Sequence, residues 1–139
     1  MTLDVFCIGL LGYQQSKEEC EMNLNNYAQQ CHQDNMKWWK DPRNPDGPKI
    51  ERNKGELIAL MHSELSEMLE GARKGKPDEH LPQYPSEHVE LVDLLIRAFD
   101  YAGAHDIPVE AIYLAKRAYN MTRADHSHEA RLQEGGKKF

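Results

Sequence analysis

Residues 86–104 read SEHVELVDLLIRAFDYAGA and are the most informative segment of the chain. Drawn as a helix, this segment carries apolar side chains on almost every side, so we expect it to be buried on most sides. Four charged residues interrupt it at intervals of three, four and three: Glu90, Asp93, Arg97 and Asp100. This spacing places all four on one face of a helix. The sequence therefore predicts a narrow, mainly acidic stripe along an apolar helix.

A second segment, residues 54–74, repeats the acidic pattern. Glu64 and Glu67 lie three residues apart beside a row of apolar positions, whereas Glu70 is turned away and is expected either at the surface or behind the ligands as a supporting residue. Buried carboxylates are costly unless they are paired, protonated, solvated in a cleft or bound to a cation. If the two segments pack as an antiparallel pair, their acidic residues form a cage of four carboxylates. Such a cage favours Mg²⁺ or Mn²⁺ over zinc, and salt-bridged faces are the alternative.

Proline and glycine divide the rest of the chain. No segment alternates convincingly with period two, so we predict one all-α domain over residues 1–139, a four-helix bundle. Ser16 and Ser86 are the expected N-caps of the first and third helices. The predicted parts are an N-terminal arm, four helices and a tail: 1–15, 16–40, 54–74, 86–104, 108–123 and 124–139.

Composition excludes several classes of function. The net charge of −6 argues against a nucleic-acid partner, and the three cysteines, without a C-x-x-C motif, argue against a disulfide framework or zinc ribbon. The longest uncharged run, residues 5–16, is too short to span a membrane and lacks the basic leader of a signal peptide. We therefore expect a cytoplasmic protein with no membrane partner.

A basic stripe follows on the predicted fourth helix. Lys116, Asn120 and Arg123 are spaced by four and three residues, which places them on one face. Two cations and an amide in line suit a phosphate chain, although an exposed helix face has the same pattern. A metal site beside such a stripe is the arrangement that phosphoryl transfer uses.

These motifs resemble a known family. Residues 64–67 (ELSE) and 90–93 (ELVD) resemble the E-x-x-E…E-x-x-D signature of the MazG-like nucleoside triphosphate pyrophosphohydrolases, which belong to the all-α NTP pyrophosphatase superfamily. Residues 116–126 resemble the K-x-x-x-N-x-x-R element of the same family. The resemblance covers residues 54–126 and implies a MazG-type fold in a homodimer or homotetramer.

The resemblance also implies an activity. Water would attack the α-phosphorus of a nucleoside triphosphate or deoxynucleoside triphosphate, releasing a monophosphate and pyrophosphate, with Mg²⁺ or Mn²⁺ as cofactor. The implied metal ligands are Glu64, Glu67, Glu90 and Asp93. The implied phosphate-binding residues are Lys116, Asn120 and Arg123. Many family members carry an acid where this chain has Ser63, so activation of the water falls to Glu67, assisted by Glu64, or to a metal-bound hydroxide.

The nucleobase pocket is expected near the end of the first helix. Trp38 or Trp39 could stack on a base while His32 or Asn35 contacts its edge, although paired tryptophans are more often core or interface residues. Two other functions stay open. One is a non-catalytic helical interaction protein with interhelical salt bridges, and the other is a pyrophosphatase for modified nucleotides or guanosine tetraphosphate.

Overall fold

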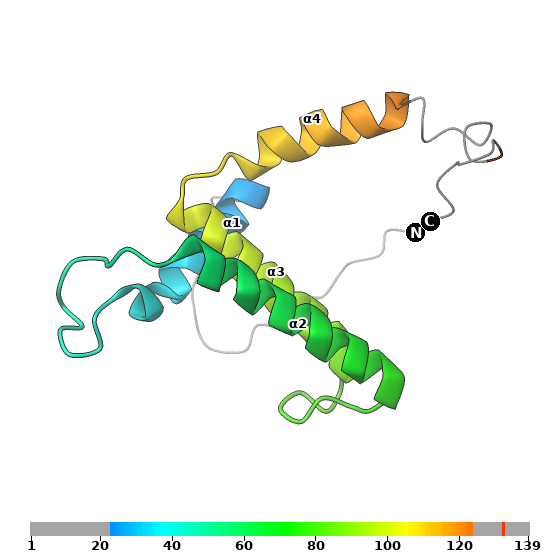
Figure 1. Ribbon diagram of the computed structural model, residues 1–139, viewed down its shortest axis with the longest axis horizontal. Helices are drawn as coiled ribbons and strands as arrows, with labels where there is room; N and C mark the ends of the chain where they lie inside the picture. The colour runs from blue at the N-terminus through cyan, green and yellow to red at the C-terminus, as the bar shows by residue number, and fades with distance from the viewer. Residues whose placement is uncertain (1–22, 124–131, 133–139) are drawn as a thin grey trace, which may run out of the picture.

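The computed structural model describes residues 23–123 and residue 132. This part of the chain contains no β-sheet, which confirms the all-α prediction. Figure 1 shows α2 and α3 lying side by side, with α1 across one end of the pair and α4 extending away from it. The elements in chain order are α1 (Leu24–Asp34), the 3₁₀ helix η1 (Met36–Trp39), α2 (Lys54–Lys74), α3 (Ser86–Ala104) and α4 (Val109–Thr122).

The helices α2 and α3 have the predicted bounds. The Asn53 side chain caps α2 by accepting hydrogen bonds from the first-turn backbone, and Gly75 ends the helix in the left-handed conformation that favours glycine. The predicted capping role of Ser86 is wrong. Ser86 is the first residue of α3 and Pro85 occupies the N-cap position without a side-chain hydrogen bond, because the fixed φ of proline already orients the chain for a helix.

Two glycines allow α3 to approach its neighbours closely. A Cβ atom on Gly71 of α2 would lie 2.7 Å from the Glu87 backbone nitrogen, and one on Gly103 of α3 would lie 2.3 Å from the Ala28 carbonyl oxygen in α1. Neither position can accept a side chain without moving backbone. The two contacts lie near opposite ends of α3, so they fix how α2 and α1 cross it.

The first helix differs from its predicted form. Its α-helical part begins at Leu24, because the Asn23 side chain accepts the Asn26 backbone N–H, and it ends at Asp34. The chain turns at Asn35 and continues as η1, so residues 24–40 are not one continuous α-helix. The turn places the indole of Trp39 in the core, where only 1% of the residue is exposed. The predicted cap Ser16, the arm 1–15 and most of the tail lie outside the described residues.

The fourth helix contacts the rest of the structure at its beginning. The Glu110 carboxylate accepts a hydrogen bond from the Leu24 backbone, and the Glu110 backbone donates to Asn25. Beyond this first turn, α4 extends away from α2 and α3, and none of its residues is buried (Figure 1). Its predicted range, 108–123, differs only at the ends, because Pro108 precedes the helix as its N-cap.

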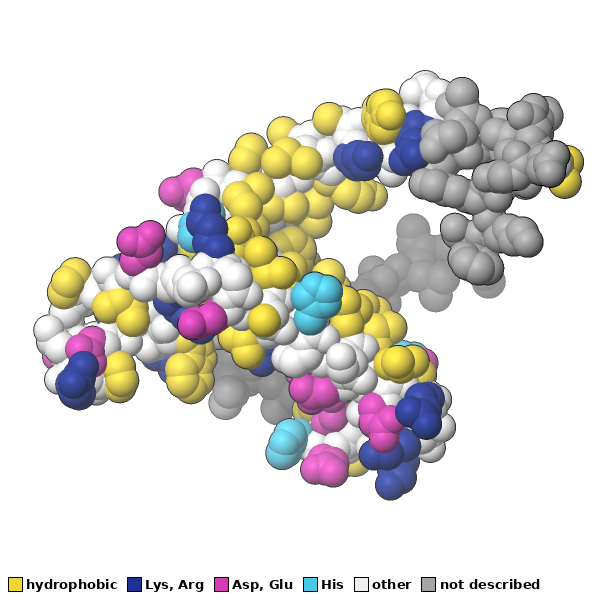
Figure 2. All heavy atoms as spheres, in the orientation of Figure 1, with side chains coloured by type: hydrophobic (Ala, Val, Ile, Leu, Met, Phe, Trp, Pro, Cys, Tyr) yellow, Lys and Arg dark blue, Asp and Glu magenta, His cyan; other side chains and the backbone are white. Residues whose placement is uncertain are grey.

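Apolar side chains remain exposed along α3 and α4 (Figure 2). The expectation that α3 is buried on most sides is therefore wrong for a single chain. The exposed large apolar residues of α3 are Leu91, Val92, Leu95 and Ile96. A homodimer or homotetramer would cover such a surface, and that assembly stays a prediction. Among the described helices, none is both long and apolar enough to cross a lipid bilayer.

The close approach of α1 and α3 gives a stability prediction. Gly103→Ala should lower the free energy of unfolding by about 1–3 kcal/mol, because the new methyl group collides with the Ala28 carbonyl. Gly55→Ala is the control, since the nearest atom to its Cβ is the tip of the Asn53 side chain at 3.1 Å. Urea unfolding of both variants measures the difference. Equal stabilities would show that this helix crossing tolerates a side chain.

Candidate functional site

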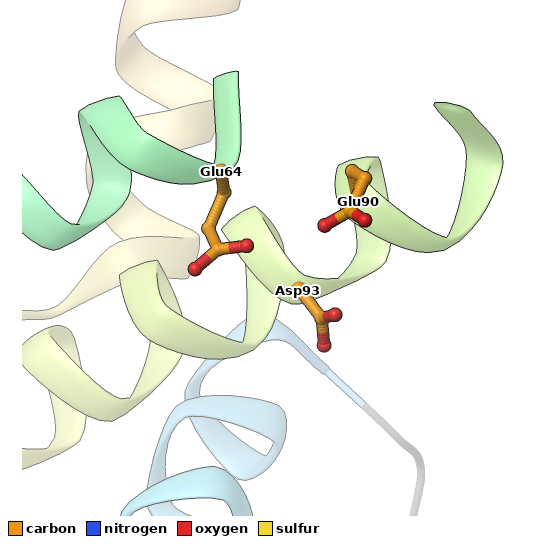
Figure 3. Close-up of side chains that lie close together, drawn as sticks. All are labelled: Glu64, Glu90 and Asp93. Carbon is orange, nitrogen blue, oxygen red and sulfur yellow. The ribbon is translucent and has the colours of Figure 1, made fainter. Parts of the chain in front are cut away.

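Three carboxylates come together between α2 and α3. One oxygen of each lies within 4.8 Å of the others in the group Glu64, Glu90 and Asp93. Figure 3 shows the Glu64 side chain reaching from α2 toward α3, which carries the other two. Glu64 is buried, with 4% of the residue exposed, and its two neighbours are partly exposed. We call this group the acidic triad.

Helix register explains why these residues meet. Glu90 and Asp93 are three residues apart, so they share a face of α3. The two helices are antiparallel, and Gly71 of α2 lies against Glu87 of α3. Glu64 precedes Gly71 by two helical turns, so it lies opposite the turn of α3 that follows Glu90. The close contact at Gly71 thus fixes the distance across which the acidic triad forms.

The triad carries more negative charge than its surroundings neutralise. The Arg97 guanidinium forms an ion pair with Glu64, with 2.5 Å between Nε and Oε1. Burial, and then the charges of Glu67 and Glu64, raise the pKa of Glu90. Burial and the charge of Glu64 also raise the pKa of Asp93, while Arg97 lowers it. Both shifts have the sign expected of carboxylates that repel one another.

The donor set fits a hard divalent cation. Three carboxylates offer only oxygen ligands, which Mg²⁺ and Mn²⁺ prefer, and a cation would offset both the burial and the repulsion that raise the two pKa values. Glu67 does not belong to the triad. It is exposed and lies near Glu90, with which it lines a separate hollow at the far end of the helix pair. Its role as a fourth ligand stays a prediction, and Glu70 pairs with Lys74 at the surface as expected.

A cleft of about 560 Å³ borders the triad. Glu64, Asp93 and Arg97 form its wall on the side of the helix pair. Asn35 and Trp38 line the same cleft, and Trp38 is 62% exposed. The structure thus brings two of the predicted base-contacting residues into one cavity with two of the predicted metal ligands.

His32 and Trp39 lie in the core beside this cleft. The Trp39 indole donates a hydrogen bond to Asp100 with 3.0 Å between Nε1 and Oδ1, and His32 Nδ1 lies 2.7 Å from the same oxygen. The other ring nitrogen of His32 lies 3.1 Å from Lys49 Nζ. A neutral imidazole satisfies both contacts by donating to Asp100 and accepting from Lys49. Both nitrogens of His32 therefore have partners in this structure, and the predicted contact of His32 with a base edge stays a prediction.

The predicted phosphate-binding stripe lies elsewhere. Lys116 and Asn120 line a separate, mainly apolar hollow of about 500 Å³ that is formed by α4 and the loop before it. Lys116 and Arg123 also lie over the Tyr119 ring. In the described chain, no residue of this stripe lines the cleft beside the triad. The roles proposed for Lys116, Asn120 and Arg123 stay predictions.

Two arginines, Arg52 and Arg97, line the cleft although neither is among the predicted site residues. Arg97 belongs to the charged stripe of α3, and its spacing of four residues from Asp93 predicts that it lies beside the carboxylates. Arg52 directly precedes Asn53, the N-cap of α2, and belongs to no periodic pattern in the sequence that would predict a role for it. Only the folded path of the loop before α2 shows where Arg52 lies.

No protein-family model matches this chain, and neither a curated protein nor a solved structure proves significantly similar to it. The resemblance to the MazG-like pyrophosphohydrolases therefore rests on the spacing of the acidic and basic residues. What the structure adds is the acidic triad and the cleft beside it.

The ion pair across α2 and α3 gives a second prediction. Arg97→Gln should lower the free energy of unfolding of the metal-free protein by about 1 kcal/mol, because it leaves the buried Glu64 carboxylate without a cation. The value is small since the Arg97 side chain is 42% exposed and water reaches the pair. Arg73→Gln, which removes the exposed pair with Glu70, is the matched control and should change little. Chemical unfolding in chelated buffer compares the two, and equal losses would contradict a special role for the buried pair.

The raised pKa values of Glu90 and Asp93 give a pH prediction. Between the ordinary carboxyl pKa of about 4 and the raised folded values, the folded chain binds more protons than the unfolded chain. This contribution to the free energy of unfolding therefore falls as pH rises through that interval. Without metal, Glu90→Gln should gain stability relative to the parent between about pH 4 and pH 7. A difference between the two proteins that does not change with pH would contradict the repulsion.

Proposed function

We propose that this protein is a Mg²⁺-dependent hydrolase that converts nucleoside triphosphates or deoxynucleoside triphosphates to monophosphates and pyrophosphate. The observation that carries the proposal is the acidic triad at the wall of a cleft with an exposed tryptophan. Its residues occupy three of the four acidic positions of the E-x-x-E…E-x-x-D signature, and Glu67 occupies the fourth. A metal-binding wall and an aromatic surface in one cavity suit a ligand with a phosphate chain and a planar base.

The residues of the cleft have distinct roles in this proposal. When bound, Mg²⁺ supplies positive charge at the phosphate oxygens and lowers the pKa of a coordinated water. Glu64, Glu90 and Asp93 hold the ion, and Trp38 and Asn35 contact the base. The water oxygen forms a bond to the α-phosphorus while the bond from that phosphorus to the bridging oxygen breaks. Pyrophosphate leaves with the bonding electrons, and the proton of the water passes to Glu64, which lines the cleft, whereas Glu67 lines a separate hollow.

A second candidate function has one observation in its favour. The Arg97–Glu64 ion pair joins α2 to α3, as expected for a non-catalytic helical protein whose acidic residues serve interhelical salt bridges. The two functions differ in their response to metal. The hydrolase predicts that millimolar Mg²⁺ raises the melting temperature, because the ion binds only the folded triad. The interaction protein predicts no such rise.

Replacement of one proposed ligand tests the enzyme directly. Asp93→Asn should lower kcat for pyrophosphate release by about 100-fold or more, because it removes a charged metal ligand while keeping the shape of the side chain. The metal-free variant should melt no lower than the parent, since a neutral amide avoids both the burial of a charge and the repulsion by Glu64, which together raise the pKa of Asp93. The assay is pyrophosphate release from a panel of nucleoside triphosphates, with and without EDTA.

Glu70→Gln is the matched control for this experiment. Glu70 is an acid of α2 that pairs with Lys74 at the surface, outside the triad. Its replacement should leave pyrophosphate release unchanged. If Asp93→Asn is destabilised and keeps the parent's turnover, the carboxylates are structural and the hydrolase proposal fails.

A further inference from the structure

We propose that Arg52 is the phosphate-binding cation of the cleft, an inference that rests on the proposed function and names a residue for its substrate. Arg52 is half-buried and lines the same cavity as Glu64 and Asp93. Within residues 23–123, no carboxylate forms an ion pair with it. A guanidinium that is partly withdrawn from water, without a carboxylate partner and facing a polar cavity, is suited to an anionic ligand.

The other cations near the cleft are already engaged. Arg97 is held by the Glu64 carboxylate. Lys49 contacts His32 and donates a hydrogen bond to the Ala104 carbonyl. The cations of α4 do not line this cleft, and Lys116 and Arg117 line a different hollow. Of the two arginines that line the cleft, Arg52 is therefore the one without a carboxylate partner among the described residues, and it can bind an anionic ligand.

The fold holds Arg52 in place before any ligand arrives. Its guanidinium carbon lies 5.5 Å from the centre of the Trp39 ring, within the range of a cation–π interaction. Trp39 is almost fully buried, and its indole nitrogen is fixed by Asp100 of α3. Asp100 thus positions Trp39, and Trp39 positions Arg52. A pre-positioned side chain loses less conformational entropy on binding than a free surface arginine.

The position of Arg52 also defines the class of ligand. Its guanidinium can donate two parallel hydrogen bonds to the oxygens of one phosphate group. The triad lies on the wall of the same cavity and would hold a divalent cation that contacts phosphates as well. A chain of two or more phosphates can contact both, so the proposed substrate feature is a polyphosphate rather than a single phosphate or a carboxylate.

The test compares arginines of one loop. Arg52→Gln should weaken the binding of inorganic pyrophosphate, measured by calorimetry in Mg²⁺, by about tenfold or more, the change expected for a lost charge-assisted contact. For nucleotide hydrolysis, KM should rise by more than kcat falls. Arg43→Gln is the matched control, because Arg43 lies in the same loop but is exposed and paired with Asp41. Lys116→Gln tests the stripe of α4 in the same assay.

Each outcome decides between the two proposals. Unchanged pyrophosphate binding and KM in Arg52→Gln overturn the role of Arg52, while an active parent enzyme keeps the proposed function. A parent that binds pyrophosphate through Arg52 but hydrolyses no nucleotide leaves an anion site and overturns the hydrolase. A parent that does neither overturns both. If Arg52→Gln does not fold, Arg52→Lys keeps the charge but loses the paired donors, and binding equal to the parent's contradicts the role of the guanidinium.

Discussion

The hydrogen bonds that reach the buried carboxylate of Asp100 hold together the elements around the cleft. An isolated charge at this depth would destabilise the fold strongly, so its oxygens must be supplied with donors. His32 from α1 and Trp39 from η1 supply them, which ties both elements to α3. The same contacts explain the break after α1, because Trp39 reaches Asp100 only if the chain turns at Asn35. One wall of the cleft, with Asn35 and Trp38, follows from this turn.

The opposite wall depends on the contact between α2 and α3 at Gly71, which brings Glu64 to Glu90 and Asp93. Carboxylates this close repel one another, and a single arginine offsets only part of their charge. Packing therefore holds together groups that electrostatics alone would separate. Functional sites often contain groups of this kind, whose mutual repulsion lowers the stability of the fold while their closeness serves a chemical role.

Much of this site was predictable because its information is local. The bounds of α2 and α3 follow from proline, glycine and apolar spacing, and the meeting of Glu64, Glu90 and Asp93 follows from helical periodicity in two antiparallel helices. The pairing of His32 with Asp100 was not predictable, since it joins residues 68 positions apart through a turn that no motif marks. Periodicity also could not show that α4 extends away from the pair, because that depends on contacts at its first turn.

The acidic stripe of α3 thus divides into residues of different kinds, although all four share one helical face. Asp100 is fully supplied with donors and serves the fold. Arg97 compensates a carboxylate of the other helix. Glu90 and Asp93 have raised pKa values, and within residues 23–123 neither forms an ion pair, although the charge of Arg97 acts on Asp93. A purely structural stripe would satisfy each carboxylate, as Asp100 is satisfied. The unequal compensation along one face is therefore the main physical support for the proposal that the uncompensated end could hold a cation.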